Sequence, residues 1–137
     1  LTIMEQYPAD ILIGAHCHRP YVLRHHHQVM INPGSVGVSF NGQREAEYAI
    51  VELENLQVEL LQVPYDFAAL QHSLYESSLF KAAPAWCQMT LRSIDEGYNH
   101  NSAFIRQFLA ATKEVHDTER LNQYWDDMSR IYLAGEL

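Results

Sequence analysis

Long apolar runs and basic residues are both scarce in this sequence. No apolar run approaches the 18 residues that a membrane-spanning helix needs, and the first seven residues have none of the marks of a secretory signal. Lysine and arginine number 9, against 17 aspartates and glutamates, and they are scattered along the chain. A chain with a net charge of −8 and no basic stripe is a poor candidate for binding a nucleic-acid backbone. We therefore expect neither a membrane segment nor a nucleic-acid surface.

Cysteine is rare as well. Cys17 and Cys87 lie far apart and form no C-x-x-C motif, which is typical of free thiols in a reducing compartment, so we expect a cytoplasmic protein. The 137 residues have the length of one domain, and 47% hydrophobic residues are enough to bury a core. The chain begins at Leu1 rather than at a methionine, and we expect it to be cut from a longer one.

Two histidines separated by one residue follow a short apolar segment. Residues 11–13 predict a buried strand, and His16 and His18 come directly after it. Because side chains alternate along an extended segment, both imidazole rings are expected on the same side. Neutral imidazole is a common ligand of Zn, Mn, Fe and Ni ions. The pair predicts ligands for one metal ion or for two adjacent ions, and two histidines without a metal are the alternative.

A second group of histidines occupies 25–27, between predicted strands at 20–24 and 28–32. Consecutive side chains point in different directions, so we interpret this run as the solvated turn of a hairpin. A storage or sensor site that combines the run with the earlier histidine pair is a weaker alternative. Cys17, between the paired histidines, is expected to be a small buried residue that points away from a metal.

Residues 32–35, Asn-Pro-Gly-Ser, form a strong turn, because proline fixes φ and glycine admits positive φ. Ser35 has no acid or base near it in the sequence, so we do not predict a serine nucleophile. Further strands are predicted at 36–40, 47–53 and 56–63. From residue 67 onward the apolar spacing of three and four predicts four helices. Their predicted start signals are Asp66, Pro84, Asn101 or Ser102, and Asp117 or Thr118.

In this order the motifs resemble the C-terminal half of a calcineurin-like metallophosphoesterase, of the small bacterial and archaeal phosphodiesterase branch. That branch has a strand with G-H-T-H-x-P, then I-N-P-G-S-x-G, then a strand pair that ends in V-P-Y-D. The matching segments here are 10–20, 31–37, 46–53 and 63–66. Two positions depart from the pattern, because Ala15 stands where the family has glycine and Cys17 where threonine is common.

The resemblance implies an α+β fold. Residues 1–66 would be the C-terminal β-rich part of a four-layer α/β/β/α sandwich, and residues 67–137 a helical extension for which the family offers no account. It also implies a metal-dependent phosphoesterase, most closely a phosphodiesterase, that attacks a phosphoester substrate with a water activated by two divalent ions. The metals could be Mn, Fe, Ni or Zn.

The resemblance assigns roles to five residues of this chain. His16 would bind one metal ion and His18 the other. The turn at Asn32, Gly34 and Ser35 would support the floor of the pocket. No catalytic residue is assigned beyond these, because the nucleophile of the family is a water.

Other ligands of the family come from D-x-H, G-D and G-N-H motifs, none of which occurs here. We therefore expect the missing N-terminal half of the same domain to supply them, and this chain alone to be inactive. A non-catalytic scaffold or protein-binding module on the same fold is the alternative. The aromatic residues of the extension also predict a homodimer contact: Trp86, Phe104, Phe108 and Trp125.

Overall fold

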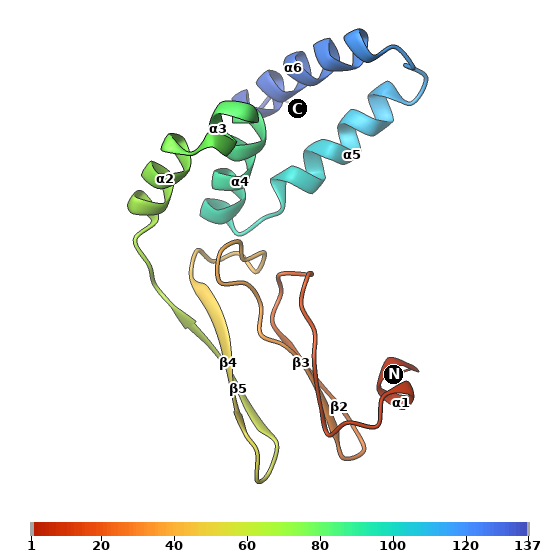
Figure 1. Cartoon of the computed structure of the whole chain (residues 1–137), viewed down its shortest axis with the longest axis vertical. Coiled ribbons are helices and arrows are strands. Elements are labelled where there is room, and N and C mark those ends of the chain that lie inside the picture. The colour runs from red at the N-terminus through yellow and green to blue at the C-terminus, as the bar shows by residue number, and fades with distance from the viewer. Residues whose placement is uncertain (1, 137) are drawn as a thin grey trace. The chain divides into compact units, whose positions relative to one another are not determined.

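The structure is a computed structural model that describes residues 2–136, and the fold is α+β, as predicted. The chain divides into two compact units, which are described separately (Figure 1). The first unit runs to Tyr65 and also contains Ile94–Tyr98. The second contains Asp66–Ser93 and the residues from Asn99 onward.

The first unit begins with a short helix and a three-stranded sheet in the order β1-β3-β2. Its elements are α1 (Thr2–Gln6), β1 (Ile11–Ile13), β2 (Tyr21–His25) and β3 (Gln28–Asn32). Strand β3 is parallel to β1 and antiparallel to β2, and its Val29 and Ile31 are fully buried. The Gln28 side chain donates hydrogen bonds of 2.8 Å to the carbonyl oxygens of Tyr7 and Ala9. These bonds fasten the N-terminal segment to the hairpin.

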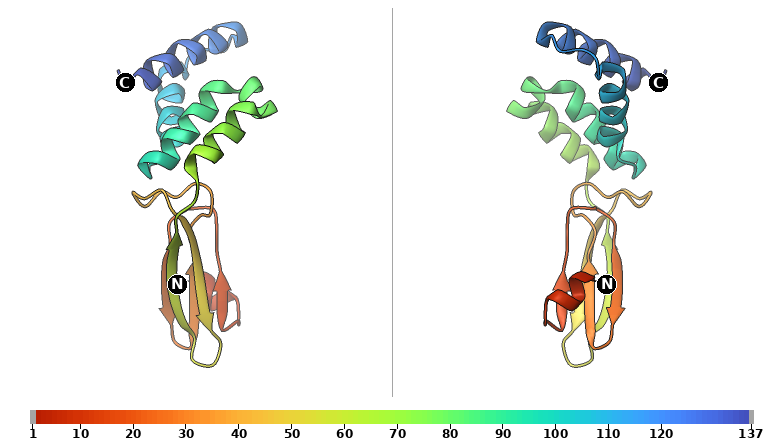
Figure 2. Two further views of the ribbon diagram at one scale, coloured as in Figure 1. Left: turned by 90° about the vertical axis from the view of Figure 1, so that its left-hand side faces the viewer. Right: turned by 90° about the vertical axis from the view of Figure 1, so that its right-hand side faces the viewer.

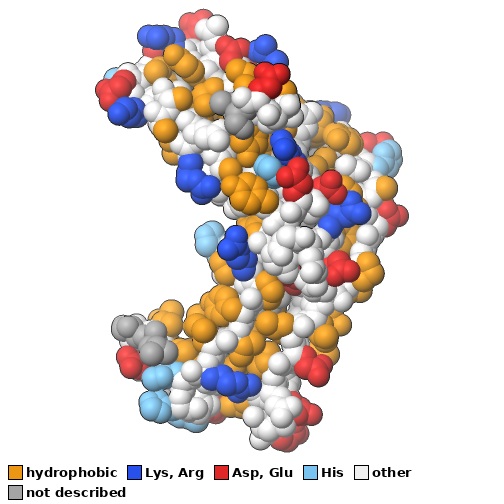
Figure 3. All heavy atoms as spheres, turned by 180° about the vertical axis from the view of Figure 1, so that it is seen from behind, with side chains coloured by type: hydrophobic (Ala, Val, Ile, Leu, Met, Phe, Trp, Pro, Cys, Tyr) orange, Lys and Arg blue, Asp and Glu red, His pale blue; other side chains and the backbone are white. Residues whose placement is uncertain are grey.

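The second sheet of this unit is the antiparallel hairpin of β4 (Ala46–Glu52) and β5 (Gln57–Val63). Figures 1 and 2 show it as a layer beside the three-stranded sheet. One face of the hairpin leaves Tyr48 and Ile50 exposed, and Figure 3 shows apolar side chains at the surface over the strands. The strand predicted at 36–40 is wrong, because the Val38 N–H donates to Ser35 Oγ rather than to a neighbouring strand.

The second unit is helical. Its helices are α2 (Phe67–Glu76), α3 (Ser78–Ala82), α4 (Pro84–Glu96), α5 (His100–Thr112) and α6 (Thr118–Ala134), with the end of α4 counted in the first unit. Asp66 and Asp117 cap α2 and α6 as predicted, because each carboxyl accepts a backbone N–H from the first turn.

The helical unit differs from the prediction in the start of one helix and in the presence of one additional helix. Helix α5 is capped by Asn99, whose side-chain oxygen lies 2.9 Å from the Ser102 nitrogen, and not by Asn101 or Ser102. The Asn101 side chain instead donates to the Trp86 carbonyl oxygen at 3.1 Å, which ties α5 to α4. Helix α3 was not predicted, although Ser77 is a standard N-cap residue and accepts the Phe80 N–H.

The core of the helical unit is aromatic. Phe104 is fully buried, and its ring centroid lies 5.0 Å from that of Trp125 and 5.5 Å from that of Tyr132. Phe108 stacks on the same cluster. Three of the four aromatic residues that suggested a homodimer therefore pack within one chain, while Trp86 is 39% exposed. The aromatic content no longer supports a dimer contact.

Replacing Phe104 by alanine is expected to lower the free energy of unfolding of the helical unit by about 3–5 kcal/mol, because the ring is fully buried among aromatic neighbours. Urea unfolding followed by tryptophan fluorescence measures this, since both tryptophans, Trp86 and Trp125, belong to this unit. Leu109→Ala is the matched control, because Leu109 is 60% exposed and its truncation should change the value by less than about 0.5 kcal/mol. Equal effects of the two substitutions would contradict the assignment of the core.

Candidate metal centre

The two candidate ligands lie in the loop that follows β1. The Gly14 N–H still donates to the Ile31 carbonyl oxygen at 2.8 Å, but beyond it the chain leaves the sheet. His16 and His18 have φ values of 77° and 54°, and the Cys17 N–H donates to the Ala15 carbonyl oxygen at 3.0 Å. The prediction of an extended segment is therefore wrong. A left-handed turn, and not strand alternation, sets where the two rings point.

The ring of His18 is held in one orientation. Its Nδ1 lies 2.7 Å from the carbonyl oxygen of Val38, and the ring stacks on that of Phe40 at a centroid distance of 5.0 Å and an angle of 11°. A carbonyl oxygen can only accept, so Nδ1 carries the hydrogen and the neutral ring presents a lone pair at Nε2. Metal-binding histidines are typically oriented by such a bond at the other ring nitrogen.

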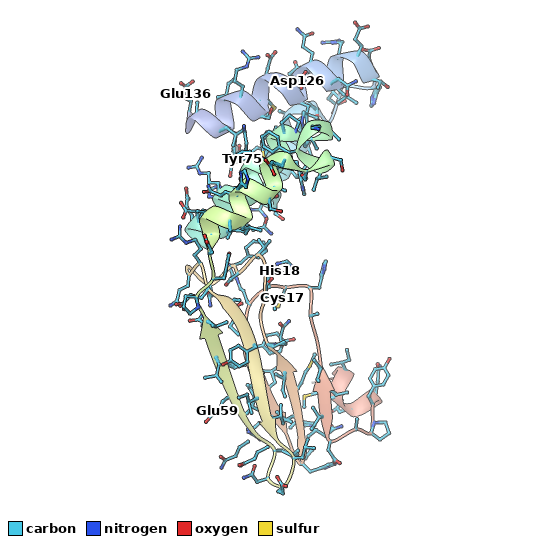
Figure 4. The ribbon with its side chains drawn as sticks, turned by 60° about the vertical axis from the view of Figure 1, so that its left-hand side comes forward. Cys17, His18, Glu59, Tyr75, Asp126 and Glu136 are labelled. Carbon is cyan, nitrogen blue, oxygen red and sulfur yellow. The ribbon has the colours of Figure 1, made fainter. Side chains whose placement is uncertain are left out.

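His16 and Cys17 are more accessible than His18. His16 is exposed, and within residues 2–136 its ring makes no hydrogen bond or ion pair. Cys17 was expected to be buried but is exposed, with its Sγ 3.0 Å from the side-chain nitrogen of Asn32. Ala15 does not have positive φ, so this position tolerates alanine in place of glycine. Figure 4 shows Cys17 and His18 in one loop at the end of the strands.

The turn at 32–35 supports this loop directly. Asn32 is fully buried, and its side-chain nitrogen donates to the Ala15 carbonyl oxygen at 3.2 Å. Its side-chain oxygen accepts the Gly34 N–H at 3.0 Å, and Gly34 has a φ of 95°. The Ser35 hydroxyl accepts the Val38 N–H at 3.0 Å. Asn32 therefore holds the histidine loop, and Ser35 holds the segment whose carbonyl positions His18.

Glu47 completes the turn and was missed by the sequence analysis. Its side chain is buried, one oxygen accepts the Ser35 N–H at 2.8 Å, and the other accepts bonds from the side-chain amides of Asn41 and Gln62. It contacts Gly34 so closely that a Cβ there would lie 2.6 Å from the Glu47 carboxyl carbon. The available signal was alternation, because Glu47 shares a strand face with the half-buried Ala49.

Phe40 was missed too. Besides stacking on His18, it donates its N–H to the His18 carbonyl oxygen at 3.0 Å and accepts the Nε–H of Arg19 at 3.1 Å. The segment 38–40 thus fixes both the imidazole of His18 and the guanidinium of Arg19. Sequence analysis had assigned this segment to a strand.

The histidine run at 25–27 lies at the other end of β2. His25 is the last residue of that strand, and only His26 and His27 form the turn. Five residues of strand span roughly 16 Å, which is too far for one ion to bind both groups of histidines. The alternative of a single site that combines them is therefore wrong. His27 faces Asp10 instead, with 3.7 Å between Nε2 and Oδ1.

A hollow of about 410 Å³ lies elsewhere on the first unit, lined by Gln43, Arg44, Glu45, Pro64 and Tyr65. Burial raises the pKa of the Tyr65 phenol, and the positive charge of Arg44 partly offsets this rise. The Arg44 guanidinium lies 2.6 Å from the Asp95 carboxyl, so its charge is already compensated. The hollow contains neither candidate histidine and does not form part of the candidate centre.

Among residues 2–136 the histidine loop offers two imidazoles as candidate ligands, and no third candidate lies in position beside them. Across residues 2–136 no group of three or more histidine, cysteine, aspartate or glutamate side chains stands ready to hold a metal ion. In the same described part, no helix is long and apolar enough to cross a membrane. Comparison of the chain with protein-family models, curated proteins and solved structures found no match.

The bond between His18 and Val38 predicts the tautomer of the ring. At a pH where the imidazole is neutral, His18 is expected to carry its hydrogen on Nδ1, because the carbonyl oxygen 2.7 Å away needs a donor. Long-range ¹H–¹⁵N NMR correlations of the histidine rings identify the tautomer. His26 is exposed and serves as the reference. A His18 ring with its hydrogen on Nε2 would contradict the orientation described above.

Proposed function

We propose that this chain is the C-terminal part of a metal-dependent phosphoesterase of the calcineurin-like type, acting as a phosphodiesterase. The observation that carries the proposal is the orientation of His18, whose Nδ1 is engaged by the Val38 carbonyl and whose Nε2 is left for a ligand. His16 lies in the same loop with an exposed ring. Two such nitrogens suit first-row divalent ions.

Different residues of the chain would bind the metal ions and support the loop that presents them. His16 and His18 would each bind one ion, and two neighbouring divalent ions would activate a water and polarise the phosphoryl group. Asn32 holds the histidine loop by its bond to Ala15, and the Val38 carbonyl engages Nδ1 of His18 and so keeps the lone pair on Nε2. Two imidazoles do not complete a two-metal site, so carboxylate ligands from outside these residues are part of the proposal.

The four-layer α/β/β/α sandwich is part of the same proposal. Two small sheets form layers in the first unit, which is compatible with the C-terminal half of such a sandwich. The exposed Tyr48 and Ile50 give the β4–β5 hairpin an apolar face that a further part of the domain would cover.

The second candidate is a non-catalytic protein-binding module. It is favoured by the same apolar face of the β4–β5 hairpin, together with the lack of a third ligand in position among residues 2–136. In that case the histidine loop would bind no metal. Metal content therefore separates the two candidates, with two ions per chain for the enzyme and none for the module.

The test is hydrolysis of bis(p-nitrophenyl) phosphate by the protein purified from its natural source, after loading with Mn²⁺. Its intact mass and N-terminal sequence are determined on the same sample, to show whether the natural chain carries D-x-H, G-D and G-N-H motifs. We expect hydrolysis that a chelator abolishes and that added Mn²⁺ restores. Absence of hydrolysis with Mn²⁺, Fe²⁺, Ni²⁺ and Zn²⁺ alike would overturn the proposal and leave the binding module.

A further inference from the structure

We propose that Arg19 is a substrate-binding residue, whose guanidinium holds a non-bridging oxygen of the phosphoryl group beside the histidine loop. This inference rests on the proposed phosphoesterase function, and it adds a contact that the metal ligands do not provide. It is carried by the anchoring of the side chain, by the residue that anchors it, and by its charge.

The guanidinium of Arg19 is anchored through one nitrogen. Its Nε–H donates to the Phe40 carbonyl oxygen at 3.1 Å, while the side chain as a whole is exposed. Guanidinium carries five N–H donors in a planar fork, so this bond leaves the two terminal nitrogens for another acceptor. A fork held at Nε is oriented in advance, which lowers the entropy lost when it binds a phosphate in bidentate fashion.

Phe40, which anchors Arg19, also positions the candidate metal ligand His18. The Phe40 carbonyl oxygen accepts the hydrogen bond from Arg19, and the Phe40 N–H donates to the His18 carbonyl oxygen. The Phe40 ring stacks on the His18 imidazole. Arg19 also follows His18 directly in the chain. The guanidinium and the imidazole are thus both held by Phe40 in one loop, and we infer that a phosphoryl group on an ion at His18 is within reach of the guanidinium.

The charge of Arg19 is not neutralised by a carboxylate. Two other arginines are paired with carboxylates, with 2.6 Å between Arg44 and Asp95 and 2.5 Å between Arg130 and Asp127. Among residues 2–136 no aspartate or glutamate lies within ion-pair distance of Arg19. In a chain with a net charge of −8, an oriented and unpaired cation beside a candidate phosphoester site is the group expected to attract an anion.

The experiment measures binding of inorganic phosphate to the 137-residue chain without added metal, through the NMR shifts of the backbone amides of residues 16–19. Three variants are compared with the unchanged chain: Arg19→Ala, Arg19→Lys and Arg24→Ala. Arg24, in β2, is the matched control, because it is also exposed and also donates to a backbone carbonyl, that of Leu56. Circular dichroism of each variant verifies that the fold is retained.

We expect Arg19→Ala to raise the dissociation constant of phosphate about tenfold, as loss of a charge-assisted hydrogen bond does. Arg19→Lys should recover part of this loss, because lysine keeps the charge and loses the fork. Arg24→Ala should change the constant less than about twofold, and added salt should weaken binding in the unchanged chain. Phosphate that does not bind, or that binds Arg19→Ala as tightly as the unchanged chain, overturns the inference.

The two proposals fail in different ways. Without hydrolysis by the natural protein, an effect of Arg19→Ala on phosphate binding would still support an anion site at this loop. With hydrolysis present and phosphate binding unchanged in Arg19→Ala, the phosphoesterase would stand and the role of Arg19 would be wrong.

Discussion

Replacing His18 by alanine in the natural protein is expected to reduce its metal content from two divalent ions to one. The lost ligand is the imidazole whose Nε2 is presented by the bond between Nδ1 and the Val38 carbonyl. Loss of a partner that only orients a ligand weakens metal binding by 10–100-fold, so loss of the ligand itself should exceed about 100-fold. Calorimetric titration with Mn²⁺ gives both the affinity and the stoichiometry.

His16→Ala should remove the other ion, and His26→Ala should remove neither. His26 is the matched control, because it is an exposed histidine of the same unit with a similar left-handed backbone, at φ 51°. Both imidazoles must be neutral to bind Mn²⁺, so protons compete with the metal ion and the affinity should also fall as the pH is lowered. Unchanged Mn²⁺ binding in both His16→Ala and His18→Ala would remove the assignment of these residues as ligands.

Gly34→Ala is expected to destabilise the first unit by about 2–4 kcal/mol. The φ of Gly34, 95°, is unfavourable for any residue with a Cβ, and the added Cβ would lie 2.6 Å from the carboxyl carbon of the buried Glu47. Either the Glu47 side chain moves and leaves the Ser35 N–H without its acceptor, or the turn opens. Urea unfolding followed by the NMR signals of β3 residues reports this unit separately from the helices.

Gly37→Ala is the control for this substitution, because nothing lies within 4 Å of a Cβ there and its φ is not positive. It should change stability by less than about 0.5 kcal/mol. The double variant Gly34→Ala with Glu47→Ala isolates the contact with the carboxyl group. It removes that group and keeps both the backbone strain and the Glu47 Cβ, which would lie 2.7 Å from the added Cβ. The double variant should lose less free energy of unfolding than the two single variants lose together. Additive losses would contradict the contact between Gly34 and Glu47.

Local signals predicted most of the secondary structure. The strands at 11–13 and 57–63 and the helices that start after Asp66 and Asp117 follow from apolar periodicity and from capping side chains, which act within a few residues of themselves. Asn99 and Asn101 show the limit of such signals. Both residue types can cap a helix, and only the packing of α5 against α4 assigns Asn101 to the Trp86 carbonyl.

The candidate centre depends on contacts that no local signal contains. The left-handed backbone of His16 and His18 accompanies a bond from Asn32 to Ala15, between residues 17 positions apart. The orientation of His18 needs Val38, which is 20 positions away and lies in a segment that reads as a strand. Sequence patterns therefore indicated which residues carry the chemistry, and the surrounding hydrogen bonds determine how these residues are presented.

The hydrogen bonds that position the histidine loop also bear on the order in which parts of the protein fold. The contacts that build the histidine loop join residues 12 to 22 positions apart, among them Asn32–Ala15, His18–Val38, Ser35–Glu47 and His18–Phe40. Loops of this length close quickly and at low entropic cost. All of these residues also precede α2, and domains are completed from the N-terminal side during synthesis. The loop and its turn therefore need no residue from α2 onward, and they can form before those helices have folded.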